Sequence, residues 1–132
     1  MTCFSVSYSQ INVTMGKQYE KDIKERTLAY AVVMVKETLV LKKEGVEYAL
    51  RDQLLRSGTS IGANVREAKA SSSRRELIRY YEIALRSCEE TEFWMNVIQL
   101  GYEMSKSRFE SLLKELNEIT RVLVTIINNL KK

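Results

Sequence analysis

Positively charged side chains are concentrated on both sides of a short serine-rich turn, which is predicted at residues 70–72. Guanidinium groups and serine hydroxyls are donors that proteins commonly use to bind phosphate oxygens. The cluster therefore indicates a candidate nucleic-acid-binding surface. Its basic residues are Arg66, Lys69, Arg74, Arg75, Arg79 and Arg86.

A plainer interpretation is that these cations are solvated helix ends. In that case Glu67, Glu76 and Glu82 pair with them internally, since each lies within reach along the same helices. The net charge of +4 permits binding to an acidic partner without requiring it. Both interpretations stay open on the sequence alone.

Gly58 and Gly62 raise the question of a phosphate-binding loop. Such a loop requires G-x-x-x-x-G-K-[ST] after a strand, whereas these two glycines have only three residues between them and lie within a helical pattern. Each glycine weakens a helix by about 1 kcal/mol relative to alanine. The spacing is better explained by close packing of one helix against another.

Catalytic chemistry has few candidates in this chain. There is no histidine, which removes Ser–His and Cys–His nucleophile pairs and the Glu-x-x-His motif of di-iron bundles. The carboxylates of Glu89, Glu90 and Glu92 do not share one helical face, so we expect ion pairs from them rather than acid–base catalysis. No metal site, cofactor or enzymatic activity is predicted, and Cys88 is expected to be a buried core residue.

A line of mostly small polar residues runs along the second predicted helix, at Gln53, Ser57, Ser60, Asn64 and Glu67. It is either an exposed flank or a hydrogen-bonded seam against a neighbouring helix or subunit. Phe93 shares a helical face with two of the arginines, where an isolated solvated ring would be unusual. The candidate seam or interface residues are Ser57, Ser60, Asn64, Glu67, Phe93 and Trp94.

The composition favours one all-α domain. The chain has 132 residues, no proline, and apolar and charged fractions of 45% and 29%, which suits long uninterrupted helices. Four helices are predicted at about 19–43, 46–69, 74–100 and 108–130, arranged as an antiparallel up-down four-helix bundle. Residues 1–16 are expected to be an irregular extension, and residues 17–132 form the bundle domain.

Helix ends are marked by characteristic residues. Gly45 is expected just after the first helix, in the left-handed conformation that glycine favours. Ser73 with Glu76, and Ser107 with Glu110, match the capping-box pattern S-x-x-E at the start of the third and fourth helices. A further turn is predicted at residues 101–102.

The apolar surface exceeds what one bundle core requires. In the first helix a stripe recurs at steps of four, three and four residues, and the segment 28–35 is apolar almost all round. The third helix is apolar over more than half of its circumference. We therefore expect a homo-oligomer that covers the surplus. The stripe consists of Leu28, Val32, Val35 and Leu39.

No stretch approaches 18 consecutive apolar residues, and the first fourteen residues lack the pattern of a signal peptide. A cytoplasmic protein without membrane contact is expected.

The segment 60–68 reads SIGANVREA, which resembles the signature S-I-P-A-N-I-x-E-G of the four helix bundle protein family, also called the 23S rRNA intervening-sequence protein family. The resemblance continues to residues 101–102 and covers roughly residues 17 to 130. Gly62 stands where the family usually has proline, and Ala68 where it usually has glycine. Both departures keep a small residue.

The resemblance implies an antiparallel four-helix bundle that assembles into a ring-shaped homopentamer. Members are encoded in insertions within bacterial 23S rRNA genes, and a related branch, the accessory variability proteins of diversity-generating retroelements, acts with a reverse transcriptase. No enzymatic activity is established for the family. We therefore expect a non-catalytic accessory protein that binds RNA or DNA, possible partners including a reverse transcriptase; the alternative is a structural or protein-docking module without a nucleic-acid role.

Overall fold

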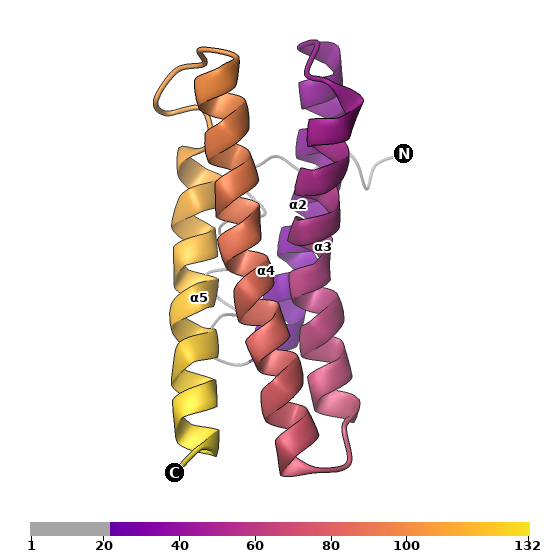
Figure 1. The fold of residues 1–132 in the computed structure, drawn as a ribbon, viewed down its shortest axis with the longest axis vertical. Coiled ribbons are helices and arrows are strands. Elements are labelled where there is room, and N and C mark those ends of the chain that lie inside the picture. The colour runs from indigo at the N-terminus through magenta and orange to yellow at the C-terminus, as the bar shows by residue number, and fades with distance from the viewer. Residues whose placement is uncertain (1–21) are drawn as a thin grey trace.

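The computed structural model describes residues 22–132, and this range contains four helices and no strand. They are α2 (Ile23–Lys43), α3 (Tyr48–Ala70), α4 (Arg74–Gly101) and α5 (Glu110–Leu130), as Figure 1 shows. The all-α prediction is confirmed for these residues. The extension predicted for residues 1–16, and the start of the first helix near Tyr19, lie outside the described residues.

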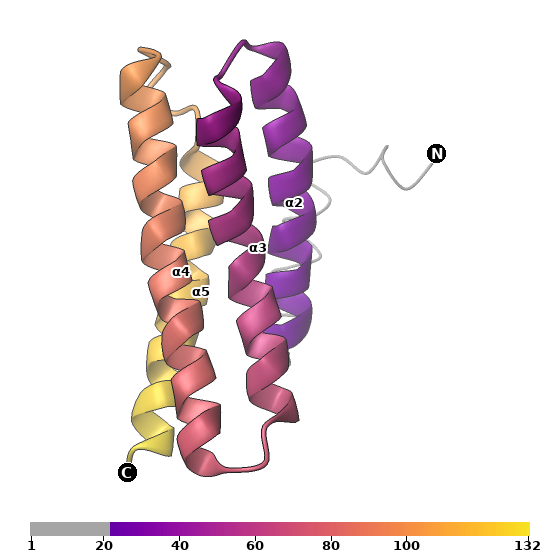
Figure 2. The same ribbon diagram turned by 45° about the vertical axis from the view of Figure 1, so that its right-hand side comes forward.

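The four helices lie side by side as long rods (Figures 1 and 2). Helix α3 packs extensively against both α2 and α4, whereas α5 packs mainly against α4 and only lightly against α2. Gly62 lies against Thr27 and Gly58 against Met34, so residue numbers rise along α2 as they fall along α3. Short connections between α2 and α3 and between α3 and α4 fix this arrangement.

The end of α2 follows the prediction. Gly45 has a φ of +86°, and its N–H donates to the carbonyl of Lys42 at 3.1 Å. The N–H of Val46 donates to the carbonyl of Leu41 at 3.0 Å, which completes a Schellman motif. Val46 and Leu41 are both buried, so the same turn closes that end of the core.

Helix α4 begins as predicted, because the N–H of Glu76 donates to Oγ of Ser73 at 3.1 Å. Its other end is less expected. Gly101 is the last helical residue, and Glu103 takes the left-handed conformation with a φ of 52°. The glycine therefore does not occupy the position in this turn that a glycine would favour.

The second predicted capping box is wrong. Helix α5 begins at Glu110 after Phe109, with no side-chain cap, and Oγ of Ser107 bonds instead to Oγ of Ser105 at 3.0 Å. Tertiary contacts explain the difference. Arg108 bonds to the carboxylates of Glu37 in α2 and of Glu44 directly after it, and Phe109 is buried, so the backbone here follows those contacts rather than the local cap.

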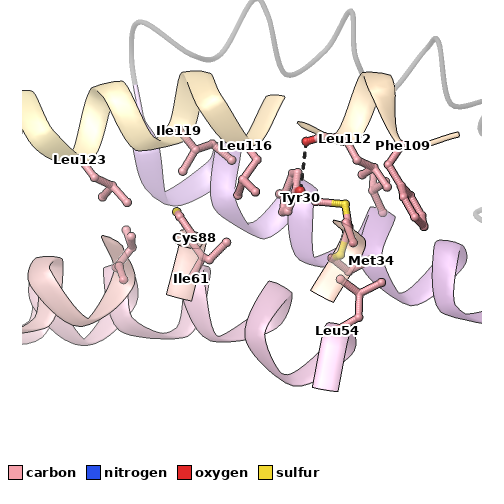
Figure 3. Close-up of a cluster of buried hydrophobic side chains, with 14 of the residues drawn as sticks. Tyr30, Met34, Leu54, Ile61, Cys88, Phe109, Leu112, Leu116, Ile119 and Leu123 are labelled. Carbon is pink, nitrogen blue, oxygen red and sulfur yellow. Dashed lines mark hydrogen bonds between the residues drawn. The ribbon is translucent and has the colours of Figure 1, made fainter. Parts of the chain in front are cut away.

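The core lies along the inner faces of all four helices (Figure 3). The Tyr30 hydroxyl donates to the carbonyl of Leu112 at 3.1 Å and joins α2 to α5 through a buried hydrogen bond. Buried residues of α3, α4 and α5 include Leu54, Ile61, Val65, Ala84, Cys88, Met95, Ile98, Leu116, Ile119 and Leu123.

The apolar stripe of α2 lies on the outer side of the bundle, away from this core. Leu28 and Leu39 are each 55% exposed, and Val32 and Val35 are more than 40% exposed. The core of α2 is formed instead by Tyr30, Met34 and other residues on the opposite face. The helix is therefore apolar on two faces, and one chain buries only one of them.

At Gly58 and Gly62, α2 and α3 approach each other closely. A Cβ atom on Gly62 would lie 3.1 Å from the carbonyl oxygen of Thr27. A Cβ on Gly58 would lie 2.5 Å from Cγ and 2.7 Å from Sδ of Met34. The packing interpretation of the G-x-x-x-G spacing is confirmed.

We predict that Gly58→Ala lowers the free energy of unfolding by about 1–3 kcal/mol, because Met34 is completely buried and cannot move aside without disturbing the core. This loss exceeds the gain of about 1 kcal/mol in helix propensity. Gly101→Ala is the matched control, since nothing lies within 4 Å of its Cβ position, and it should be stabilising. Urea denaturation at one protein concentration measures both; a stabilised Gly58→Ala contradicts the account.

Cys88 is confirmed as a core residue, and burial raises the pKa of its thiol to about 12. At pH 8 only about one thiol in ten thousand is then ionised. We predict that in a Cys3→Ser background the native protein reacts with Ellman's reagent far more slowly than the urea-unfolded protein does. The absorbance at 412 nm follows both reactions, and equal rates would contradict the prediction.

Candidate nucleic-acid interface

The predicted basic residues are positioned by the end of α3 and the start of α4. Arg66 and Lys69 lie on the last turns of α3, and Arg74 and Arg75 open α4 after the turn at residues 71–73. The C-terminus lies at the same end of the bundle (Figure 1), which adds Lys131 and Lys132. This end therefore carries a higher density of cations than the sequence spacing alone revealed.

All six predicted phosphate-binding residues are exposed. Among the described residues, the five arginines make no ion pair and no side-chain hydrogen bond, and Lys69 has one distant partner, the carboxylate of Asp22 at 3.9 Å. The internal pairing considered from the sequence is wrong in this respect. Glu82 pairs with Lys131 at 3.0 Å, while Glu67 and Glu76 form no ion pair within residues 22–132. No group within residues 22–132 therefore competes with an external anion for these guanidinium groups.

The structure divides the basic set. Arg74, Arg75 and Arg79 lie within the first two turns of α4, whereas Arg86 follows about 10 Å further along the helix. Arg66 borders an apolar groove between α2 and α3. The most compact group of cations is therefore the first turns of α4 with Lys69.

The serines of the turn have different roles. The Ser71 hydroxyl donates to the carbonyl of Ala68 at 2.6 Å and completes the end of α3. Ser73 caps α4 by accepting from the N–H of Glu76, so its own hydroxyl proton is still available. Ser71 is thus a helix-ending residue. The hydrogen-bond donors that the site offers to an anion are mainly guanidinium groups.

The polar line of α3 forms a seam with α4 over part of its length. Oγ of Ser87 donates to Oγ of Ser60 at 3.1 Å, and Nδ2 of Asn64 donates to the same oxygen at 3.0 Å. Ser57 is buried and donates to the carbonyl of Leu54, whereas Glu67 is exposed. Ser87 was not among the predicted seam residues, and its signal in the sequence is a small hydroxyl residue one turn before Thr91, beside the apolar face of α4.

Phe93 and Trp94 lie on different sides of α4. Phe93 is 56% exposed, and Trp94 is half-buried, with the two rings edge to face at a centroid distance of 5.0 Å. The indole N–H of Trp94 is buried without a partner among the described residues. Phe93 presents an apolar knob on the outer face of the bundle.

The acidic group of α4 does not form the ion pairs that we expected. Glu89, Glu90 and Glu92 are exposed and have no basic partner within residues 22–132. The same part of the chain contains no cluster of three residues able to hold a metal ion. None of its helices is long and apolar enough to cross a bilayer.

The fold and the site define a class of small all-α proteins with four long helices and a basic end. The chain belongs to the 23S rRNA-intervening sequence protein family, whose family model matches residues 19–125. This confirms the resemblance carried by the segment at residues 60–68.

Among solved structures, the chain is similar to the crystal structure of a protein of unknown function from the S23 ribosomal protein family of Bacteroides thetaiotaomicron. The sequences are 37% identical and the TM-score is 0.76, with 80% of this chain and 98% of that chain covered. No curated protein matches the chain. The family is therefore established, and the function is a separate question.

Proposed function

We propose that the protein is a non-catalytic accessory factor that binds RNA or DNA through its basic end. In this proposal the chain is an antiparallel four-helix bundle that assembles into a ring-shaped homopentamer. The observation that carries the binding role is that Arg74, Arg75 and Arg79, in the first turns of α4, are exposed and make no ion pair within residues 22–132. Unpaired guanidinium groups at one end of a bundle are suited to phosphate contacts, which need no base-specific geometry.

Self-association supports the binding role. Each chain has a formal charge of +4, so an assembly of several copies multiplies the positive field at the surfaces where the basic ends gather. The exposed stripe of α2 gives a physical reason for association, because contiguous apolar surface of this kind is rarely left in water. We also propose a reverse transcriptase as a partner, since such an enzyme binds nucleic acid and the basic end could contact the same nucleic acid.

The test is the salt dependence of binding to structured RNA and to duplex DNA, measured by electrophoretic mobility shift. Arg74→Glu with Arg75→Glu should weaken binding at least about tenfold and reduce the log–log salt slope by about 2 for duplex DNA. Glutamate is well tolerated in the first turn of a helix, so the variant should fold. Unchanged affinity or an absent salt slope would refute the proposal.

Lys42→Glu with Lys106→Glu is the matched control. It makes the same change in net charge, and both lysines are exposed at the opposite end of the bundle. If binding depends on the basic end specifically, this control should have little effect on the affinity for RNA or DNA. Equal losses from both variants would mean that only total charge matters.

The exposed apolar surface favours a second candidate function, a protein-docking module without a nucleic-acid role. Phe93 and the stripe of α2 would then serve self-assembly and one protein partner. A purified complex with that partner that is unaffected by nuclease and by the Arg74→Glu, Arg75→Glu variant would support this alternative.

A further inference from the structure

We infer that two different faces of the bundle meet between neighbouring copies: the acidic outer face of α4, with Phe93 as its knob, and the basic apolar groove between α2 and α3. This inference rests on the proposed self-association, and it identifies the surfaces that produce it. The occupant of each face is therefore a second copy of this chain.

The face between α2 and α3 is an apolar groove with cations along its rim. Leu28 and Ala31 of α2 and Gly62 and Ala63 of α3 line it, and Lys24 and Arg66 stand at its edge. The groove has a volume of about 170 Å³, and Ala31, Gly62 and Ala63 line it with small residues, so it has room for an aromatic ring from outside. It continues into the exposed stripe that starts at Leu28.

The other face is the acidic outer face of α4. Phe93 projects from it, and Glu89 and Glu90 lie one turn earlier on either side of the ring position. Leu100, which is 77% exposed, extends the apolar part by two further turns. Arg86 is the cation nearest along this face, two turns before Phe93.

Charge complementarity selects this pairing over contact between two α2 stripes. Among the charges that flank the stripe, those without an ion pair in residues 22–132 are mainly Lys24, Lys36 and Lys43, with Glu25 as the exception. A symmetric contact of the stripe with its own copy would bring these lysines together, which is unfavourable. Contact with the acidic face of α4 would instead bring Glu89 and Glu90, which also have no ion pair in this part of the chain, to the cations, and Phe93 to the apolar groove.

The pairing is heterologous, since the two faces are different surfaces of one chain. A heterologous contact repeats from copy to copy and either closes into a ring or continues as a chain. The basic first turns of α4 are not used in it, so they stay available for phosphate in the assembly.

A charge-reversal cycle followed by sedimentation velocity tests the inference. Glu89→Lys with Glu90→Lys, and separately Lys24→Glu with Arg66→Glu, should each shift the protein toward the single-chain mass of 15.3 kDa at low micromolar concentration. The chain with all four substitutions has the charges exchanged, so it should assemble again. Glu110→Lys, which reverses an exposed charge on α5, a helix that belongs to neither face, should leave the assembly unchanged.

The outcomes separate this inference from the proposed function. If the unaltered protein is a single chain, the proposed self-association fails. If it is an oligomer that the Glu89→Lys, Glu90→Lys variant leaves intact, only the identified interface is wrong. If both pairs of substitutions dissociate the protein but their combination does not restore assembly, the two faces do not contact each other.

Discussion

Arg26→Met is expected to lower the free energy of unfolding by about 3–5 kcal/mol. Arg26 is only 4% exposed, and its Nε and Nη2 atoms donate to the two carboxylate oxygens of Glu115, both at 2.6 Å. This bidentate pair joins α2 to α5, which otherwise have few contacts. Methionine would fill much of the volume but leave the largely desolvated carboxylate of Glu115, which is 14% exposed, without this cation.

The control is a double variant, Arg26→Met with Glu115→Leu, which removes both charges and keeps apolar volume. It should recover most of the lost stability, since apolar replacement of a complete buried pair is often neutral or favourable. Urea denaturation at fixed protein concentration measures all three proteins. A double variant as unstable as Arg26→Met would show that the loss came from packing rather than from the unpaired carboxylate.

The penalty should also depend on pH. Burial raises the pKa of Glu115, and the bonds from Arg26 oppose that rise. Without Arg26 the folded-state pKa rises further, so the folded variant retains a proton that the unfolded chain has released. Its stability therefore falls as pH increases through this window, and the deficit relative to the unaltered protein should be larger at pH 7 than near pH 4. A deficit independent of pH would contradict this account.

Arg108→Ala should have the second largest effect, a loss of about 2–4 kcal/mol, because it leaves the buried carboxylate of Glu37 unpaired. The Arg108 guanidinium bonds Glu37 through Nη1 and Glu44 through Nη2, the latter at 2.6 Å, and lies over the ring of Phe109 at 4.9 Å. It thus ties the end of α2 to the turn before α5.

Two variants separate the contributions at this site. Glu44 is 40% exposed, so Glu44→Ala should cost no more than about 1 kcal/mol. Arg108→Lys keeps the charge but lacks the fork that reaches both carboxylates, and it should give an intermediate loss. Thermal and urea denaturation would rank the three variants; a Glu44→Ala loss equal to that of Arg108→Ala would contradict the importance of the buried partner.

Much of the fold could be predicted because local chemistry agrees with the tertiary arrangement. The period of buried positions in α3, α4 and α5, the left-handed Gly45 and the Ser73 cap are all local signals that the structure confirms. The Ser107 cap was wrong because long-range bonds from Arg108 outweighed it. An ion pair between residues 71 positions apart leaves no local signal in one sequence.

The candidate site was predictable in part. The sequence located the arginines around the turn, since their types and positions are visible in it. It did not show that they lack internal partners, because whether a carboxylate reaches a guanidinium depends on side-chain placement in three dimensions. Lys131 and Lys132 lie at the same end of the bundle as these arginines because α5 packs against α4, and this packing is not visible in the sequence.

The sequence by itself determined the helical class, the family and the surplus of apolar surface, because periodicity and composition act along the chain. Only the tertiary structure decided which apolar face of α2 enters the core. Its two faces have similar hydrophobicity, and the choice depends on which one fits the small residues of α3 and the hydrogen bond from Tyr30 to α5. The stripe left outside is exposed in a single chain, and it is part of the surface that we propose for association.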